Sequence, residues 1–160
     1  MKKSIILMGV LLVLSLGLVA CGTNGDTSTD SKSEKKEDKI HKVGDTVEID
    51  KVKMTLTKVE PTDKRNEFAD TKPAKVARVE YTIENNSDQE VAVGSDLEAY
   101  DSTKTKLETY PVDGVTLDTV APGKKINVVA GFGYEKGPLE IQFSPIMSFS
   151  DSAKFKVDIQ

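Results

Sequence analysis

The side chains most often used for covalent and metal chemistry are scarce in this sequence, because cysteine and histidine occur once each, as Cys21 and His41. A single cysteine cannot form an internal disulfide. His41 lies in or beside a charged stretch, where we expect a solvated linker residue, so the domain that follows lacks the histidine for a Ser-His or Cys-His pair. We therefore do not expect an enzyme that works through such a nucleophile, and the interest of Cys21 lies in its position.

Cys21 directly follows the longest apolar run of the chain, residues 5–20. Lys2 and Lys3 precede this run, and a basic segment followed by an apolar one is the pattern of a secretory signal. The run is shorter than the ~20 residues that an α-helix needs to cross a bilayer. We therefore expect a signal peptide over residues 1–20 rather than a permanent transmembrane helix.

The end of this signal, Leu18-Val19-Ala20-Cys21, resembles the bacterial lipobox. In proteins that carry this motif a diacylglycerol is joined to the cysteine sulfur, and the signal is removed just before it. The resemblance implies lipid attachment at Cys21 and anchoring at the outer face of the cell membrane, in a bacterium of the Gram-positive type. A two-chain lipid suffices for durable anchoring, so the polypeptide needs no membrane-binding surface of its own. The alternative is a stray cysteine in an ordinary signal peptide.

Residues 22–42 change abruptly to a polar, mixed-charge composition with one aliphatic residue, Ile40. Such a segment buries too little apolar surface to offset the entropy lost on ordering. We therefore expect residues 21–42 to form a disordered tether, with a root-mean-square span of roughly 25 Å and a fully extended length of at most ~70 Å. The whole chain has a formal net charge of −4. Because nucleic-acid binding depends on neutralising phosphates, we expect no nucleic-acid partner.

Residues 43–160 have the length of one domain and alternate apolar with polar side chains. In the first run Val52, Met54 and Leu56 point one way, and Lys53 and Thr55 point the other. Alternation of this kind predicts half-buried strands. Further runs of the same kind cover residues 77–83, 91–99, 126–134, 139–143 and 153–159. No window shows a helical period, so a parallel α/β architecture, which needs crossover helices, is excluded.

Turn residues separate these runs. Residues 85–88, Asn-Asn-Ser-Asp, form a polar turn signal, and residues 121–124 place Pro and Gly at the centre of a predicted type II turn. Asp113-Gly114 and residues 136–138 are further chain-reversal signals. Short antiparallel strands joined by such turns predict a β-sandwich or barrel.

Three stretches in this order resemble an immunoglobulin-like domain of unknown function found in bacterial lipoproteins and immunoprotective extracellular proteins. They begin at Gly44-Asp45, at the strand that ends in residues 83–87, and at Pro122-Gly123. The resemblance implies an immunoglobulin-like antiparallel β-sandwich of about seven or eight strands, and it carries no catalytic residues. The family usually has a longer aliphatic run after Pro-Gly. Here Gly131 and Gly133 interrupt it, which leaves the strand pairing near Phe132 open.

Acidic side chains supply the remaining candidates for chemistry. Asp96 with Glu98, or Glu98 with Asp101, are close in sequence and provide the oxygen ligands and carboxylate pairs that Ca²⁺ sites and glycosidases use. The alternative is a wet sheet face, because residues two apart on a strand share a side. The sequence contains no cluster of Cys, His and carboxylate side chains that could bind zinc. We therefore expect neither a bound metal nor a cofactor.

The segment from Pro61 to Pro73 is long for a connection in a compact domain, and long loops often carry function. It mixes charges around one aromatic residue, Phe68. Because Arg and aromatic side chains anchor many protein interfaces, Arg65 and Phe68 are our candidate interaction residues. The alternative is that Phe68 packs back over the edge of the sandwich.

Three hypotheses follow from the sequence. The first is a non-enzymatic, lipid-anchored surface domain that contacts the membrane through the lipid on Cys21 and binds a protein or envelope component through loops at one end. The second is a small-ligand or Ca²⁺-binding lipoprotein, and the third is a cell-wall hydrolase.

Overall fold

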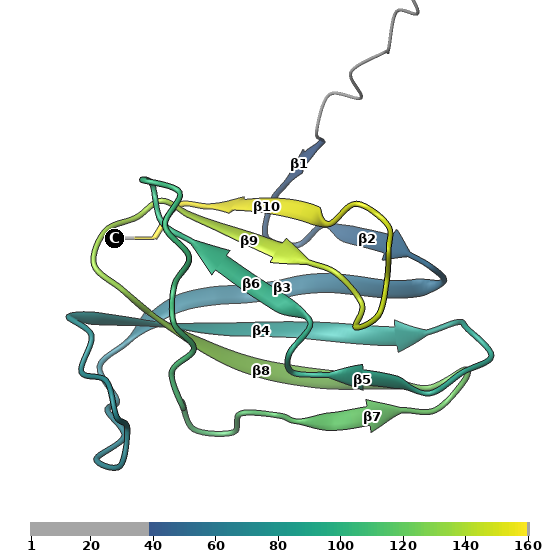
Figure 1. Ribbon diagram of the computed structural model, residues 1–160, viewed down its shortest axis with the longest axis horizontal. Coiled ribbons are helices and arrows are strands. Elements are labelled where there is room, and N and C mark those ends of the chain that lie inside the picture. Colours follow the sequence, from purple (N-terminus) through teal and green to yellow (C-terminus); the bar gives the residue numbers. More distant parts are fainter. Residues whose placement is uncertain (1–38, 160) are drawn as a thin grey trace, which may run out of the picture. The chain divides into compact units, whose positions relative to one another are not determined.

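Alternating side chains produce strands throughout the described part of the chain. The computed structural model describes residues 39–159, in which ten strands and no helix occur (Figure 1). In chain order the strands are β1 (Ile40–His41), β2 (Thr46–Ile49), β3 (Val52–Thr62), β4 (Lys75–Asn85), β5 (Val91–Val93), β6 (Leu97–Tyr100), β7 (Asp118–Val120), β8 (Lys125–Tyr134), β9 (Leu139–Phe143) and β10 (Ala153–Val157). The predicted all-β class is confirmed. Ten strands are present where seven or eight are predicted, because β1, β5 and β7 are only two or three residues long.

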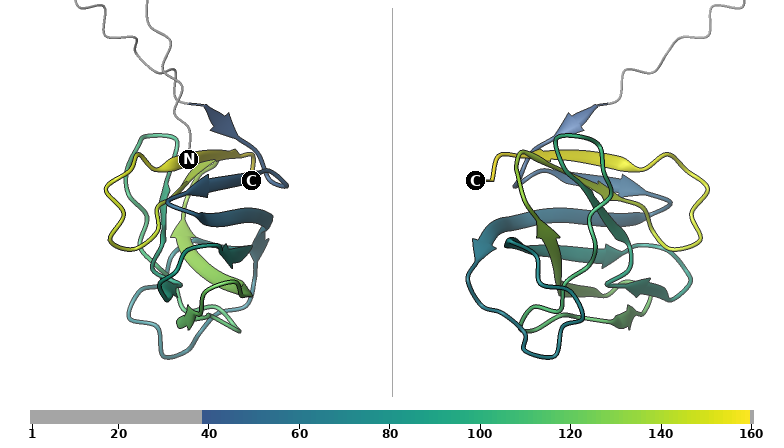
Figure 2. Two further views of the ribbon diagram at one scale, coloured as in Figure 1. Left: turned by 90° about the vertical axis from the view of Figure 1, so that its right-hand side faces the viewer. Right: turned by 60° about the vertical axis from the view of Figure 1, so that its left-hand side comes forward.

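The strands form two four-stranded sheets and one short ribbon. Sheet A has the order β1-β10-β9-β6, sheet B has the order β2-β3-β4-β8, and β5 pairs with β7 in sheet C. Sheets A and B lie face to face, as the turned views in Figure 2 show. All pairs are antiparallel except β1 with β10, which is parallel. The immunoglobulin-like sandwich implied by the resemblance is therefore confirmed.

The core lies between the two sheets and is filled by the predicted inward side chains. On sheet B, Leu56, Tyr81 and Ile83 are at most 1% exposed, and on sheet A Ile141 and Phe155 are fully buried. Burying an aliphatic or aromatic side chain of this size contributes roughly 1.5–3 kcal/mol relative to leaving it in water. Because the outward positions of the same strands are mostly exposed or half-buried, the period-two pattern fixes which face of each strand points to the core.

One predicted strand divides in two. The run at residues 91–99 forms β5 in sheet C and β6 in sheet A, with a break at Gly94. Gly94 has a φ of +95°, and a Cβ there would lie 2.0 Å from the carbonyl oxygen of Thr116. Only glycine fits at this position, where the chain passes from one sheet to the other.

The two glycines of β8 do not interrupt its pairing, since β8 pairs with β4 in register from Lys125 to Tyr134. A Cβ at Gly131 would lie 2.4 Å from the carbonyl oxygen of Tyr110, and one at Gly133 would lie 2.7 Å from Cβ of Pro73. The glycines thus let neighbouring loops lie directly against β8. The backbone of Tyr110 donates to the Gly131 carbonyl at 2.8 Å, so this loop also covers the free edge of sheet B, where exposed strands are prone to aggregate.

The sandwich begins before the predicted boundary at residue 43, because β1 at Ile40–His41 pairs with β10. The ring of His41 packs on Phe155 with ring centroids 5.3 Å apart, and its side chain is only 13% exposed. The prediction of a solvated linker residue at His41 is therefore wrong: the sequence pattern there is too short to reveal a two-residue strand. The predicted signal peptide, Cys21 and most of the predicted tether lie outside the described residues. Within residues 39–159, no helix is long and apolar enough to span a membrane.

Candidate interaction surfaces

The loop at residues 63–74 joins β3 to β4 and contains both candidate interaction residues. The Arg65 guanidinium donates to the carbonyl oxygen of Thr62 at 2.6 Å and to that of Ala74 at 3.3 Å. These two carbonyls stand at the two ends of the loop. Arg65 therefore closes the loop by binding its own backbone, and its guanidinium is already engaged by acceptors within the chain.

The tip of the same loop is fixed from the side by Tyr110, which is 3% exposed. The backbone N–H of Asn66 donates to the Tyr110 hydroxyl at 2.8 Å, and the N–H of Phe68 donates to the Asn66 side chain at 2.9 Å. Phe68 is 93% exposed. The alternative that Phe68 packs over the sandwich edge is therefore wrong, while its role in binding stays a prediction.

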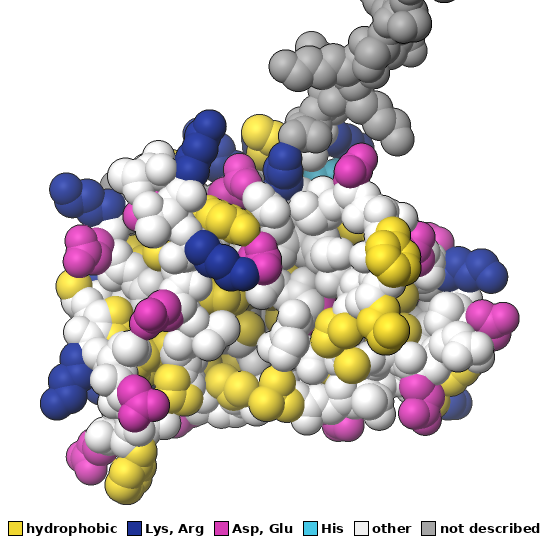
Figure 3. Space-filling model, viewed as in Figure 1, with side chains coloured by type: hydrophobic (Ala, Val, Ile, Leu, Met, Phe, Trp, Pro, Cys, Tyr) yellow, Lys and Arg dark blue, Asp and Glu magenta, His cyan; other side chains and the backbone are white. Residues whose placement is uncertain are grey.

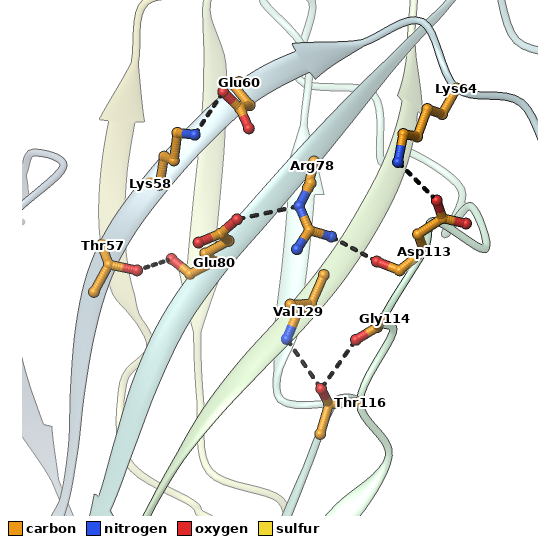
Figure 4. Close-up of polar contacts among 10 residues, drawn as sticks. All are labelled: Thr57, Lys58, Glu60, Lys64, Arg78, Glu80, Asp113, Gly114, Thr116 and Val129. Atoms are coloured by element: carbon orange, nitrogen blue, oxygen red, sulfur yellow. Dashed lines mark hydrogen bonds and ion pairs between the residues drawn. The ribbon is translucent and has the colours of Figure 1, made fainter.

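The outer face of sheet B beside this loop carries paired charges, drawn in Figure 4. Arg78 bonds Glu80 at 3.1 Å and donates to the backbone oxygen of Asp113 at 2.6 Å, and the Lys64 ammonium lies 3.0 Å from the Asp113 carboxylate. Exposed pairs of this kind contribute only about 0–1 kcal/mol each. Their effect is positional, because they hold the segment around Asp113 against the sheet. Thr57 occupies an irregularity in the β3–β4 register and donates to the Glu80 carbonyl at 2.8 Å.

The carboxylates considered for acid–base or Ca²⁺ chemistry are engaged by other side chains. Asp96 lies before β6 rather than in it and is 4% exposed. The prediction of a wet sheet face is therefore wrong for Asp96. Its carboxylate accepts from the Tyr81 hydroxyl at 2.5 Å and from the Gly94 N–H at 2.9 Å. Asp101 accepts from the side chain and backbone of Thr103, within its own turn.

Burial raises the pKa of Asp96, and the hydrogen bonds from Tyr81 and Gly94 oppose that rise. Burial and the neighbouring Asp96 charge also raise the pKa of Tyr81, so its hydroxyl stays protonated and donates. A buried carboxylate is costly unless it is hydrogen-bonded. The pair therefore fixes the crossing between β5 and β6. Glu98 differs, because Lys106 and then Tyr100 hold the pKa of its carboxyl below the usual range. Within residues 39–159, no group of three or more His, Cys, Asp or Glu side chains is arranged to hold a metal ion.

A second exposed loop, at residues 144–152 between β9 and β10, was not singled out by the sequence. Met147 is 88% exposed, Phe149 is fully exposed, and Ile146 is 43% exposed. Figure 3 shows hydrophobic side chains gathered over this loop, at the right of the view. The sequence signal for this loop is a group of apolar residues between two strands, without a turn glycine. A single sequence does not distinguish such a group from core residues.

A groove of about 430 Å³ lies over β6 and β8, and no residue of the loop at 144–152 lines it. Its apolar lining comes from β6, β8 and the segment before β7, and includes Leu97, Leu107, Val115, Leu117, Ala130 and Phe132. Ser95 and Glu98 line both this groove and a second hollow, which is also lined by residues 144–148. The volume lies within the range of small-ligand sites.

Solved structures with the same fold come from bacterial β-sandwich proteins. A predicted lipoprotein of Bacillus subtilis, ycdA, is 19% identical with a TM-score of 0.60, and the match covers 71% of this chain and 38% of ycdA. A β-sandwich protein of Clostridium difficile 630 is 19% identical with a TM-score of 0.50, over 78% of this chain and 99% of that one. The secreted protein MPT63 of Mycobacterium tuberculosis is 10% identical with a TM-score of 0.54, over 74% and 95%.

At these identities the likeness shows the fold alone, a β-sandwich, and the chain spans only 38% of the length of ycdA. The family follows from the sequence itself. The chain belongs to the DUF5067 family, a domain of unknown function, whose model matches residues 27–145. The resemblance to an immunoglobulin-like domain of unknown function is thereby confirmed. No curated protein matches the chain.

Proposed function

We propose that this protein is a lipid-anchored binding module at the outer face of the cell membrane, which presents the loop at residues 63–74 to a protein or envelope partner. The observation that carries the proposal is Phe68, an aromatic side chain that is 93% exposed at the tip of a loop closed by Arg65. Large aromatic side chains are frequent anchors of protein interfaces. We expect no enzymatic activity, as the sequence indicates.

The bracing of this loop supports a binding role. Binding orders loops and side chains, and each immobilised group costs free energy. Here Arg65, Asn66 and Tyr110 already fix the loop before any partner arrives, which lowers that cost. Arg65 acts in this proposal by positioning the loop, while Phe68 makes the contact.

Crosslinking from intact cells tests the binding role. A photo-reactive amino acid in place of Phe68, in the full chain, is expected to give a defined protein adduct on illumination. The same group in place of Phe149, on the second exposed loop, is the matched control and is expected to give no such adduct. The same adduct from both positions, or none from position 68, would contradict the proposal.

The anchor is tested separately by mass analysis of the mature N-terminus. We expect residue Cys21 to come first and to carry a diacylglycerol, and Cys21→Ser to abolish the lipid. The similarity in fold to a predicted lipoprotein supports this expectation. Cleavage elsewhere, or an unmodified thiol, would refute the anchor without bearing on the crosslink.

The two alternatives from the sequence are outcomes of simple assays on the same protein. Calorimetry with Ca²⁺ is expected to be flat, whereas a saturable heat that disappears in Asp96→Asn would favour a calcium-binding lipoprotein. Turnover of cell-wall fragments by the purified protein would favour a hydrolase and overturn the non-enzymatic role.

A further inference from the structure

The loop at residues 144–152 presents an apolar tip with no charge on it. Residues 144–150 read Ser-Pro-Ile-Met-Ser-Phe-Ser, and neither Lys nor Arg occurs between Phe143 and Lys154. Met147 and Phe149 are 88% and 104% exposed. Single exposed apolar residues are ordinary on protein surfaces, but adjacent large ones on one loop mark a contact site.

The tip is held with its apolar side chains outward. Asp50, in the β2–β3 turn, accepts from the Ser148 hydroxyl at 2.5 Å and from the Ser150 hydroxyl at 2.9 Å. The Ser148 N–H donates to the Pro145 carbonyl at 2.9 Å, and Met147 has a φ of +68°. The serines therefore point to the body of the domain, and the alternating residues Met147 and Phe149 point to solvent.

The N-terminal part of the chain joins the sandwich beside this loop. β1 runs parallel to β10, with Ile40 opposite Lys154, and the loop ends where β10 begins at Ala153 (Figure 1). Ile40, at this junction, is itself 57% exposed. Ile40 therefore lies beside the start of β10, where this loop ends.

We propose that the loop at residues 144–152 contacts the lipid bilayer, with Met147 and Phe149 entering the interface between headgroups and acyl chains. The inference rests on the proposed lipid anchor at Cys21. The tether that the sequence predicts over residues 21–42 has a root-mean-square span of roughly 25 Å, so an anchored domain would hold the loop at a high effective concentration near lipid. Apolar and aromatic side chains are those that partition into this interface.

The contact gives the domain a fixed orientation. The β2–β3 turn, which braces the loop, precedes β3, and the loop at residues 63–74 follows the end of β3. The two loops thus stand at opposite ends of one 11-residue strand. A bilayer contact at residues 144–152 turns Phe68 outward, away from the lipid.

Lipid charge has little part in this contact. The loop contains no Lys or Arg; its one charged residue is Asp151, and the carboxylate that braces it, Asp50, is also acidic. Attraction of basic residues is what makes interfacial binding depend on anionic lipid. We therefore expect contact with neutral phosphatidylcholine, unchanged by salt.

Tryptophan fluorescence tests the contact, because the chain contains no tryptophan. The full-length lipidated variant Phe149→Trp is reconstituted in phosphatidylcholine vesicles with brominated acyl chains. Its emission is expected to shift to the blue and to be quenched several-fold more than that of Phe68→Trp, the matched control at the other end of β3. Replacing part of the lipid with phosphatidylglycerol is expected to leave the quenching unchanged.

Each of the other outcomes contradicts a specific part of the proposal. Equal, weak quenching of both variants, in protein that still floats with the vesicles, overturns the loop contact and leaves the anchor standing. Protein that does not float refutes the anchor, and with it the contact that rests on it. Quenching that changes several-fold with phosphatidylglycerol would show that headgroup charge, and not apolar contact, determines the interaction. A blue shift that appears without vesicles and grows with protein concentration would identify a second copy of the chain as the occupant.

Discussion

The two exposed loops at opposite ends of β3 each present a phenylalanine to solvent, but they are built differently. The loop at residues 63–74 mixes acidic and basic side chains around Phe68, whereas residues 144–150 carry no charge around Phe149. The first loop is fixed by the buried Tyr110 and by Arg65, and the second is fixed by the exposed Asp50.

The difference shows why exposure alone does not define a binding surface. A polar rim around one aromatic is the composition of a protein interface, and an uncharged apolar tip is the composition of a lipid contact. Hydrogen bonds hold both loops in place, so each aromatic side chain is exposed in a fixed position.

The largest effect is expected at Tyr110, the buried support of the loop at residues 63–74. Tyr110→Ala removes a side chain that is 3% exposed and should lower the free energy of unfolding by about 3–5 kcal/mol. Tyr110→Phe keeps the ring and loses the hydroxyl, which accepts from the Asn66 N–H at 2.8 Å and donates to the Asn66 carbonyl at 3.5 Å, so we expect a loss of about 1 kcal/mol. Urea denaturation of both variants measures the difference. Equal losses would show that the ring does not support the loop by packing.

A smaller effect is expected at Arg65, which closes the same loop. Arg65→Ala leaves the carbonyls of Thr62 and Ala74 to water and should cost about 1 kcal/mol of stability, with faster proteolysis within residues 63–74. Lys64→Ala is the control, because its ion pair with Asp113 joins side chains that are 78% and 79% exposed. If the control is cut as quickly as Arg65→Ala, closure by the guanidinium is not what orders the loop.

The brace of the second loop is expected to depend on pH. The Ser148 hydroxyl, and then that of Ser150, hold the pKa of Asp50 below its ordinary value of 3.8. Because the pKa is lower in the folded state, the bracing is complete above the ordinary value and is lost as the pH falls through the folded one. NMR relaxation of the amides at residues 146–150 should therefore change only in acid. Asp50→Ala should show the loosened state at every pH, and loosening of the native loop near neutral pH would contradict this account.

The sequence predicted the sandwich because period-two alternation and turn residues report local geometry directly. The inward positions of β3 and β4 and the turn at Gly123, with its φ of +69°, were read from residue types alone. The crossing at Gly94 was missed because Val93 and Leu97 are both buried, so alternation continues while the partner sheet changes. Only tertiary contact with Thr116 reveals the break.

The candidate surfaces were predicted less completely, because exposure is a property of the assembled fold. Arg65 was correctly placed in a loop, but its engagement by the loop's own carbonyls depends on how residues 62 and 74 meet. The surface of β8 at its two glycines is already covered, by Val112 at Gly131 and by Pro73 at Gly133. Phe68 therefore cannot pack there. Met147 and Phe149 are residue types that are usually buried in a core, and nothing in their local sequence predicts that they are exposed to solvent.

The smallest effect on stability is expected at the two aromatic tips themselves. Phe68→Ser and Phe149→Ser each replace a side chain that is at least 93% exposed, and surface changes of this kind alter the free energy of unfolding by less than about 0.5 kcal/mol. The two variants should therefore be indistinguishable in urea and separate only by function: the first is expected to lose its protein partner, the second its lipid contact. A clear loss of stability in either variant would mean that the side chain packs in solution. Loss of both interactions in one variant would show that the two ends of β3 do not act as separate surfaces.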